Sequence, residues 1–290
     1  MRIAQISVLV ATRERPERLE RCIRGVLHGE VLPAEIVVVD QSPDRPPVGT
    51  ATDPVELLVV GDGGRGLSRA RNLALQAARQ PIVAVLDDDC VASPGWLSAI
   101  DGTLAAGSVD AVAGPVLPLP PEGAEVHAVS SRRSLEPRTY TGTSAPWRVG
   151  TGGNFAVRTE RLRELGGYDE RLGAGTAAMA GEDVDLVYRL LRAGAKIAYV
   201  PDALVHHSRT NATRRRATRN GYGRGAGTFI GLHLRAREAS AATVLGRWVV
   251  DRAALLGRAA LRADSHGALE ELLVLRGTAA GLVDGLRGAG

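Results

Sequence analysis

An apolar run that ends in three acids constrains this chain most. Ile82–Leu86 is a run of five apolar residues, followed directly by Asp87, Asp88 and Asp89. A short unbroken apolar run is typical of a strand buried on both faces, as in a parallel sheet. Three carboxylates beside a core repel one another and resist desolvation, and magnesium or manganese would remove that conflict. Because ligands bind beyond the carboxyl ends of strands in open parallel sheets, the triplet predicts a metal and ligand site. The plainer alternative is a solvated acidic turn.

The composition fits a folded chain in a reducing environment. The 290 residues are 44% hydrophobic, enough for one large domain or for a domain with a helical appendage. The net charge of +4 is compatible with an anionic substrate or membrane surface and does not demand nucleic acid. Cys22 and Cys90 provide no disulfide framework. Since there is no signal-peptide core and no run of about 18 apolar residues, we expect a cytoplasmic protein, with any membrane contact peripheral on the inner face of the plasma membrane.

Strands and helices alternate up to the acidic triplet, which predicts an α/β sheet with mainly parallel strands. Pro16 is expected to start one helix, and a glycine-rich turn, 61–66, is expected to start another that ends near Arg79. The expected strands are Ile6–Ala11, Glu35–Val39, Glu56–Val60 and Ile82–Leu86.

The next part of the chain has weaker cues. The polar, proline-rich stretch 118–148 is expected to be a binding loop or disordered. A helix is expected from Glu182, with Asp185 on its surface and the acids of its first turn favoured by the helix dipole. The expected strands here are Ala111–Val116, Gly150–Val157, Ile197–Val200 and Ala203–Val205, the last leading to His206 and His207.

The chain changes character after Ser208. Arg209–Arg219 carries five arginines and no acids, and Asn220–Gly231 is rich in glycine. Helices are expected at 241–262 and 267–286, with Trp248 in an apolar stripe between arginines. We therefore predict an α/β domain over 1–210 and a helical tail over 211–290. The stripe predicts either peripheral membrane attachment or packing on the domain or on another subunit.

Four stretches, in this order, resemble the family 2 glycosyltransferases of the GT-A fold. Each motif alone is weak, but the ordered set, which covers about residues 5–210, is specific. The fold that the resemblance implies is a mixed, mainly parallel sheet flanked by helices, here with a C-terminal helical appendage. The stretches are Ile6–Thr12, Glu35–Asp40, Ala70–Asn72 with Leu86–Asp89, and Gly181–Leu186 through to His207.

The resemblance implies transfer of a sugar from a nucleotide-diphosphate sugar to an acceptor hydroxyl, with inversion at the anomeric carbon. Asp89, Asp87 and His207 match the metal shell, which would hold Mn²⁺ or Mg²⁺ against the leaving diphosphate. Asp183 matches the general base that accepts the acceptor's proton. The acceptor is expected to be an envelope polysaccharide, a glycolipid or a natural product.

Further residues match the substrate-binding positions of the family. The alternative for Asp40 is the cap of an Asx-type turn, and the alternative for Arg71 is a buried ion pair with an aspartate. Departures from the family pattern after the first two strands leave the nucleotide open, with UDP- or dTDP-sugars favoured. The implied donor contacts are Thr12, Asp40, Arg71, Asp87 and Asp88, and the implied acceptor contacts are Asn154 and Glu182.

Two other functions compete with this interpretation. A sugar-phosphate nucleotidyltransferase also combines an α/β sheet with metal-binding acids, but it should carry a glycine-rich loop after the first strand, where this chain has 12–16 without glycine. A non-catalytic protein that binds nucleic acid or another anionic surface would use Arg209–Arg219. Aromatic residues are only 3% of the chain, which disfavours base stacking, and no nucleic-acid partner is expected.

Overall fold

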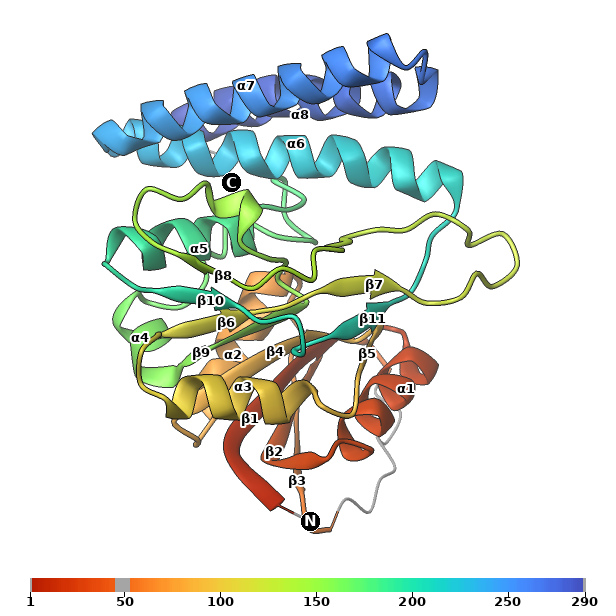
Figure 1. The fold of residues 1–290 in the computed structure, drawn as a ribbon, viewed down its shortest axis with the longest axis vertical. Helices are drawn as coiled ribbons and strands as arrows, with labels where there is room; N and C mark the ends of the chain where they lie inside the picture. The colour runs from red at the N-terminus through yellow and green to blue at the C-terminus, as the bar shows by residue number, and fades with distance from the viewer. Residues whose placement is uncertain (1, 45–52, 289–290) are drawn as a thin grey trace.

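The computed structural model describes residues 2–44 and 53–288. A central sheet carries helices on both faces, and three long helices lie in a further layer beyond its C-terminal part (Figure 1). The α/β class and the GT-A arrangement predicted from the sequence are confirmed.

The larger sheet has eight strands in the order β3-β2-β1-β4-β9-β6-β10-β8. β1 to β4 run parallel, β9 is antiparallel to both its neighbours, and β8 is antiparallel to β10. A second sheet has the order β5-β11-β7. In chain order the strands are β1 Arg2–Thr12, β2 Val31–Asp40, β3 Glu56–Gly61, β4 Ile82–Asp87, β5 Cys90–Ala92, β6 Ala111–Ala113, β7 Val116–Pro118, β8 Arg138–Tyr140, β9 Asn154–Arg158, β10 Ile197–Tyr199 and β11 Val205–His207.

Five helices cover the larger sheet. α1 (Pro16–Leu27) begins with its proline in the first turn, as predicted, and turns Leu19, Ile23 and Val26 to one face of the sheet. α3 (Trp96–Ala105) joins it there, while α2 (Leu67–Ala77), α4 (Thr159–Glu164) and α5 (Glu182–Arg192) pack on the other face.

The strand register brings the polar strand ends together. Thr12 pairs with Asp40, and Ala11 pairs with Asp87, so three neighbouring parallel strands end at the same edge. In the second sheet His207 pairs with Cys90, which immediately follows the acidic triplet. The fold thus gathers residues from both ends of the catalytic region at one sheet edge.

Two expectations for the middle of the chain are wrong, and a third, the loop at 118–148, is made more precise. The single strand expected at 111–116 is two strands, β6 and β7, in different sheets. Between them, a side chain on Gly114 would overlap the carbonyl of Ala203. The stretch 118–148 contains β8 and a short 3-10 helix, Pro146–Arg148. β9 begins only at Asn154, so Gly152 and Gly153 precede the strand.

The arginine-rich and glycine-rich segments after residue 210 form one continuous helix, which the sequence did not predict. It is α6 (Ala212–Arg235), and α7 (Ala239–Leu261) and α8 (Ser265–Arg287) follow it. The glycines serve close packing, since a side chain on Gly223 or Gly227 would overlap α8 backbone at Val274 or Thr278. Glycine in a helix usually costs stability, so this tertiary reason was invisible in the local pattern.

The three last helices pack on the rest of the chain. Phe229 of α6 and Trp248 of α7 share a buried cluster with Tyr188 of α5, and the rings of Trp248 and Trp147 lie edge to face, 5.0 Å apart. This contact supports the packing alternative for the apolar stripe, while the domain boundary at residue 210 stays a prediction. Over residues 2–44 and 53–288, no helix combines the length and apolar character needed to cross a bilayer.

Candidate active site

The end of β4 and the end of β11 form a cluster of metal-ligating groups. Ligand atoms of Asp87, Asp89, Cys90 and His207 all lie within 4.8 Å of one another. His207 Nε2 lies 3.3 Å from Asp89 Oδ1, while its Nδ1 lies 2.6 Å from the carbonyl of Ser208. Because that carbonyl can only accept, Nδ1 donates a proton to it, and Nε2 is the ring nitrogen that faces the acids and could bind a cation. Two carboxylates and an imidazole are a donor set that fits Mn²⁺.

Cys90 belongs to the cluster but was not predicted. Its only sequence signal is its place directly after the triplet. Burial, with the charges of Asp87 and Asp89, raises the pKa of its thiol well above the ordinary value. Since the thiolate is the ligand form, the carboxylates and the imidazole are better placed to hold a hard cation.

Two arginines at the start of α1 neutralise the triplet, and sequence reasoning missed both. Arg15 lies 3.1 Å from Asp88, and Arg18 lies 3.4 Å from Asp89. Asp88 also accepts a hydrogen bond of 2.8 Å from the Thr12 hydroxyl. Burial, with the charge of Asp89, still raises the pKa of Asp88 to about 6. Thr12 and Asp88 are thus hydrogen-bonded to each other. Their contacts with the nucleotide-sugar donor stay a prediction.

Arg71 joins the acidic strand end to the start of α5. Its side chain is buried, and it donates to Asp87 over 2.8 Å and to Glu182 over 3.1 Å. Burial lowers the pKa of Arg71, but the carboxylates of Asp87, Glu182 and Asp183 more than offset it, so the net pKa is raised. The ion-pair alternative for Arg71 is therefore the observed geometry, and its contact with a diphosphate stays a prediction.

Asp183 faces a cleft of about 400 Å³. Its Oδ2 accepts from the amide of Gly152 over 2.9 Å, and its Oδ1 accepts from the amide of Val184 over 2.8 Å. Beside it, burial and the charge of Asp183 raise the pKa of Glu182 to about 7. Asp87 lines the same cleft, whereas Asp89 and His207 do not and adjoin it through Asp87. The proposed base and the metal cluster thus meet at Asp87.

Glycine is required where the cleft floor approaches the acids. A side chain on Gly152 would come within 2.9 Å of Asp183 Cβ and 3.0 Å of an Arg71 nitrogen. A side chain on Gly153 would overlap the Asp87 carboxylate. The pair of glycines therefore sets the spacing between the strand end and α5.

Two other side chains that were predicted to contact substrates are hydrogen-bonded to groups of the protein itself. Asp40 Oδ1 accepts from both the amide and the hydroxyl of Ser42, which is the Asx-type alternative. Asn154 is 1% exposed. Its carboxamide accepts from Trp96 and donates to the carbonyls of Pro115 and Ala203. The contact of Asp40 with the sugar donor stays a prediction, and so does the contact of Asn154 with the acceptor substrate. The burial of the Asn154 amide disfavours the second contact.

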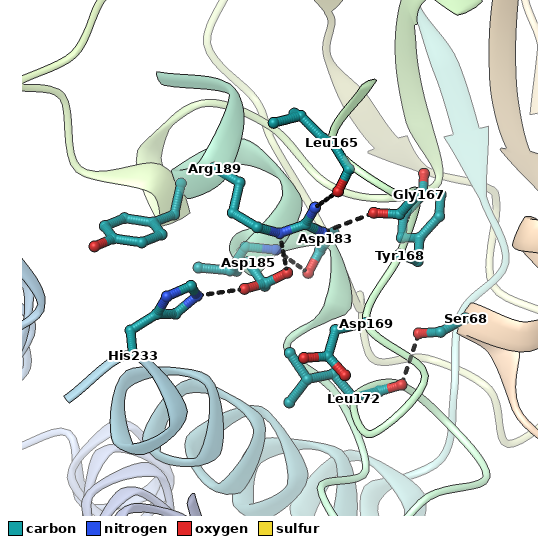
Figure 2. Close-up of polar contacts among 12 residues, drawn as sticks. Ser68, Leu165, Gly167, Tyr168, Asp169, Leu172, Asp183, Asp185, Arg189 and His233 are labelled. Atoms are coloured by element: carbon teal, nitrogen blue, oxygen red, sulfur yellow. Dashed lines mark hydrogen bonds and ion pairs between the residues drawn. The ribbon is translucent and has the colours of Figure 1, made fainter. Parts of the chain in front are cut away.

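Asp185 was expected on the helix surface, and that expectation is wrong. It is buried, and it accepts from Arg189 and pairs with His233 of α6, each over 2.7 Å (Figure 2). The other ring nitrogen of His233 lies 2.7 Å from Glu238. The helix that carries Asp183 is therefore tied to the C-terminal helices two residues further on.

His233→Gln is expected to destabilise the protein in a pH-dependent way. Burial lowers the pKa of His233, but Asp185 and Glu238 raise it above the ordinary 6.5. Its contribution is therefore complete below pH 6.5 and lost as pH rises through the folded-state pKa. The charged groups around it are Asp185 and Arg189 of α5 and Glu238. We expect a loss of about 1.5–3 kcal/mol at pH 6, as for a hydrogen bond to a charged group, that shrinks in alkaline buffer. Urea unfolding at both pH values measures it, and a pH-independent difference would contradict the assignment.

The fold and site together define a glycosyltransferase of the GT-A class, with an acidic strand end, a metal-ligand cluster and a carboxylate at the start of a helix across the cleft. The sequence profile described as "Glycosyltransferase like family 2" matches residues 4–226, and the chain belongs to this family.

Known relatives agree with this assignment. The pre-mycofactocin glycosyltransferase of Mycobacterium tuberculosis is 29% identical over 228 residues, which are 72% of this chain but only 44% of the relative. Among solved structures, a mannosyltransferase from Pyrobaculum calidifontis in complex with GDP-Man and Mn²⁺ aligns with a TM-score of 0.63 at 19% identity, over 97% of this chain and 87% of that one. GalNAc-T7 with UDP, GalNAc and Mn²⁺ aligns with a TM-score of 0.54 at 21% identity, over 71% and 44%. These structural likenesses concern the fold.

Proposed function

We propose that the protein transfers a sugar from a nucleotide-diphosphate sugar to an acceptor hydroxyl with inversion at the anomeric carbon. One observation carries the proposal. Asp87 belongs both to the cluster with Asp89 and His207 and to the cleft that Asp183 faces. A donor held at the cluster would therefore present its sugar to the cleft in which the proposed base lies.

In this proposal Asp183 accepts the proton of the attacking hydroxyl. The amides of Gly152 and Val184 hold its two oxygens, so the carboxylate is oriented before the acceptor arrives. A carboxylate can serve as this base when proton transfer comes late in the displacement. Glu182 orients the acceptor, and Arg71 keeps the two flanking acids in place.

The proposed metal site is Asp87, Asp89 and His207, and the cation would be Mn²⁺ or Mg²⁺. When bound, the ion would neutralise the charge that develops on the leaving diphosphate. Asp87 and Asp89 provide the oxygens, and His207 presents Nε2 because its Nδ1 proton is held by Ser208. The bound Mn²⁺ in two structural neighbours supports this choice.

A UDP- or dTDP-sugar is our preferred donor, although one neighbour binds GDP-Man and another binds UDP. The acceptor would belong to an envelope polysaccharide, a glycolipid or a natural product. The name of the mycobacterial relative supports the last class. The test is nucleotide release from a panel of UDP-, dTDP- and GDP-sugars with Mn²⁺, followed by NMR of the product's anomeric proton. We expect Mn²⁺-dependent release and inverted configuration; retention of configuration would refute the proposed chemistry.

We further propose a cytoplasmic protein that attaches to the inner face of the plasma membrane through α7. Val250 is 66% exposed and Leu261 is 90% exposed on this helix, and Arg247 and Arg258 lie beside them in sequence. Such a surface suits an anionic interface. Co-sedimentation with vesicles of anionic lipid tests it, with Val250→Asn/Leu261→Asn as the comparison. Truncation at residue 210 is a poor control because it would uncover Tyr188 and its neighbours. Equal sedimentation of both proteins would end the idea.

A further inference from the structure

A second cavity, of about 830 Å³, lies beside the cleft and is strongly basic. Its walls come from the segment 126–133, the N-terminal half of α6 and the start of α8. Among the described residues that line it, two are acids, Asp264 and Glu270, and five are arginines. These arginines are Arg133, Arg209, Arg215, Arg216 and Arg219.

The acids of this cavity are already occupied. Asp264 accepts from the amide of Gly267 at the start of α8. Glu270 accepts from Arg215 and lies 3.5 Å from Arg219. In the part of the chain that the structure describes, Arg133 and Arg216 have no carboxylate partner. The cavity therefore offers unneutralised guanidinium groups, which suit a phosphate.

The basic cavity adjoins the catalytic cleft. Ser130, Ser131, Arg219 and Tyr222 line both of them. The Ser130 and Tyr222 hydroxyls lie 2.6 Å apart, so hydroxyl groups and a guanidinium lie at the boundary between the two spaces. A molecule with its hydroxyl at Asp183 could place an anionic group in the cavity.

The cleft itself also contains a partly buried cation that lacks an acid partner. Arg132 donates to the carbonyl of Trp147 over 3.0 Å, and no carboxylate of the described chain forms an ion pair with it. Burial lowers the pKa of Arg132 below its ordinary value. Arg219 and Arg252 line the same cleft, and each is already paired with Glu271. An anion on the acceptor side would give Arg132 the charged partner that it lacks.

We propose that the cavity binds a phosphate or diphosphate group carried by the acceptor. This inference rests on the proposed function, because it assigns the acceptor's anion to the side of the cleft opposite the donor's metal cluster. It predicts a phosphorylated acceptor, and the phosphate could belong either to a lipid carrier or to a soluble sugar phosphate.

The test is calorimetric titration of the whole protein in EDTA, so that a metal-dependent donor site does not contribute. The probes are geranyl diphosphate, geraniol, inorganic pyrophosphate, glucose 1-phosphate and a short single-stranded DNA. The variant is Arg133→Gln/Arg216→Gln, which removes two exposed side chains that have no carboxylate partner among residues 2–44 and 53–288. The control, Arg237→Gln/Arg276→Gln, removes the same charge from exposed positions outside the cavity and the cleft.

We expect the wild type to bind the phosphorylated probes and the variant to bind them about tenfold more weakly, with the control unchanged. Tighter binding of geranyl diphosphate than of pyrophosphate and glucose 1-phosphate would assign the phosphate to a lipid carrier, and the reverse to a soluble acceptor. Equal binding by wild type and variant, equal binding of geraniol, or tighter binding of DNA would overturn the inference. UDP binding with Mn²⁺, measured on the same proteins, reports on the donor site. Its absence would count against the proposed function alone.

Discussion

Asp183→Asn is expected to reduce sugar transfer by about 10²–10⁴-fold, the usual contribution of a general base. The amide keeps the size of the side chain, and its one oxygen can accept from only one of the two amides, Gly152 or Val184. It cannot take the proton of the acceptor. The loss should therefore appear in kcat, whereas UDP binding with Mn²⁺ should stay unchanged. Steady-state kinetics together with calorimetric titration of UDP measure both quantities.

Asp202→Asn is the matched control for this experiment. Asp202 is exposed, forms no ion pair with any residue that the structure describes, and lies outside the cleft. Its substitution should leave kcat unaltered. If Asp183→Asn kept wild-type kcat, or if it lost UDP binding as well as activity, the residue would not be the base.

Asp89→Asn is expected to remove the Mn²⁺-dependent part of UDP binding. In the wild type, UDP and Mn²⁺ together at 100 times the dissociation constant should stabilise the fold by about 2.7 kcal/mol. Asn lacks the charge that pairs with the cation, so this gain should fall close to zero. Thermal unfolding with UDP, with Mn²⁺ and with both gives the effect as a difference of shifts.

That difference is needed because the substitution also changes the protein without ligands. Asp89 lies within ion-pair distance of Arg15, Arg18 and His207, so its loss alters the melting temperature of the free protein as well. Asp202→Asn again provides the comparison. An Asp89→Asn protein with the full joint shift would show that the metal, if any, binds elsewhere.

The parallel core was predictable because its signals are local. The apolar run Ile82–Leu86 and the proline at the start of α1 each specify an element without help from distant residues. α6 was missed because its glycines read as breakers, whereas Gly223 and Gly227 fit against the backbone of α8. A pattern along one helix does not reveal which helix will pack on it.

At the candidate site too, local sequence did not reveal partners that are distant in the chain. Asp87, Asp89 and His207 were predicted from their order in the chain, and the structure brings them together. Asp185 was placed on the surface because nothing in its own helix indicates His233, which is 48 residues away. Arg15 was overlooked for a similar reason, since the charged run Arg13-Glu14-Arg15 is also typical of a solvated turn.

The central claim is that the acids after β4 and the histidine of β11 hold a cation at the mouth of the cleft containing Asp183. Anomalous scattering from crystals of the protein grown with Mn²⁺ and UDP tests it most directly. We predict one strong manganese peak within coordination distance of Asp89 and His207, beside Asp87, with the UDP diphosphate next to it. Bound UDP with manganese at some other group, or with no manganese at these three side chains, would contradict the account.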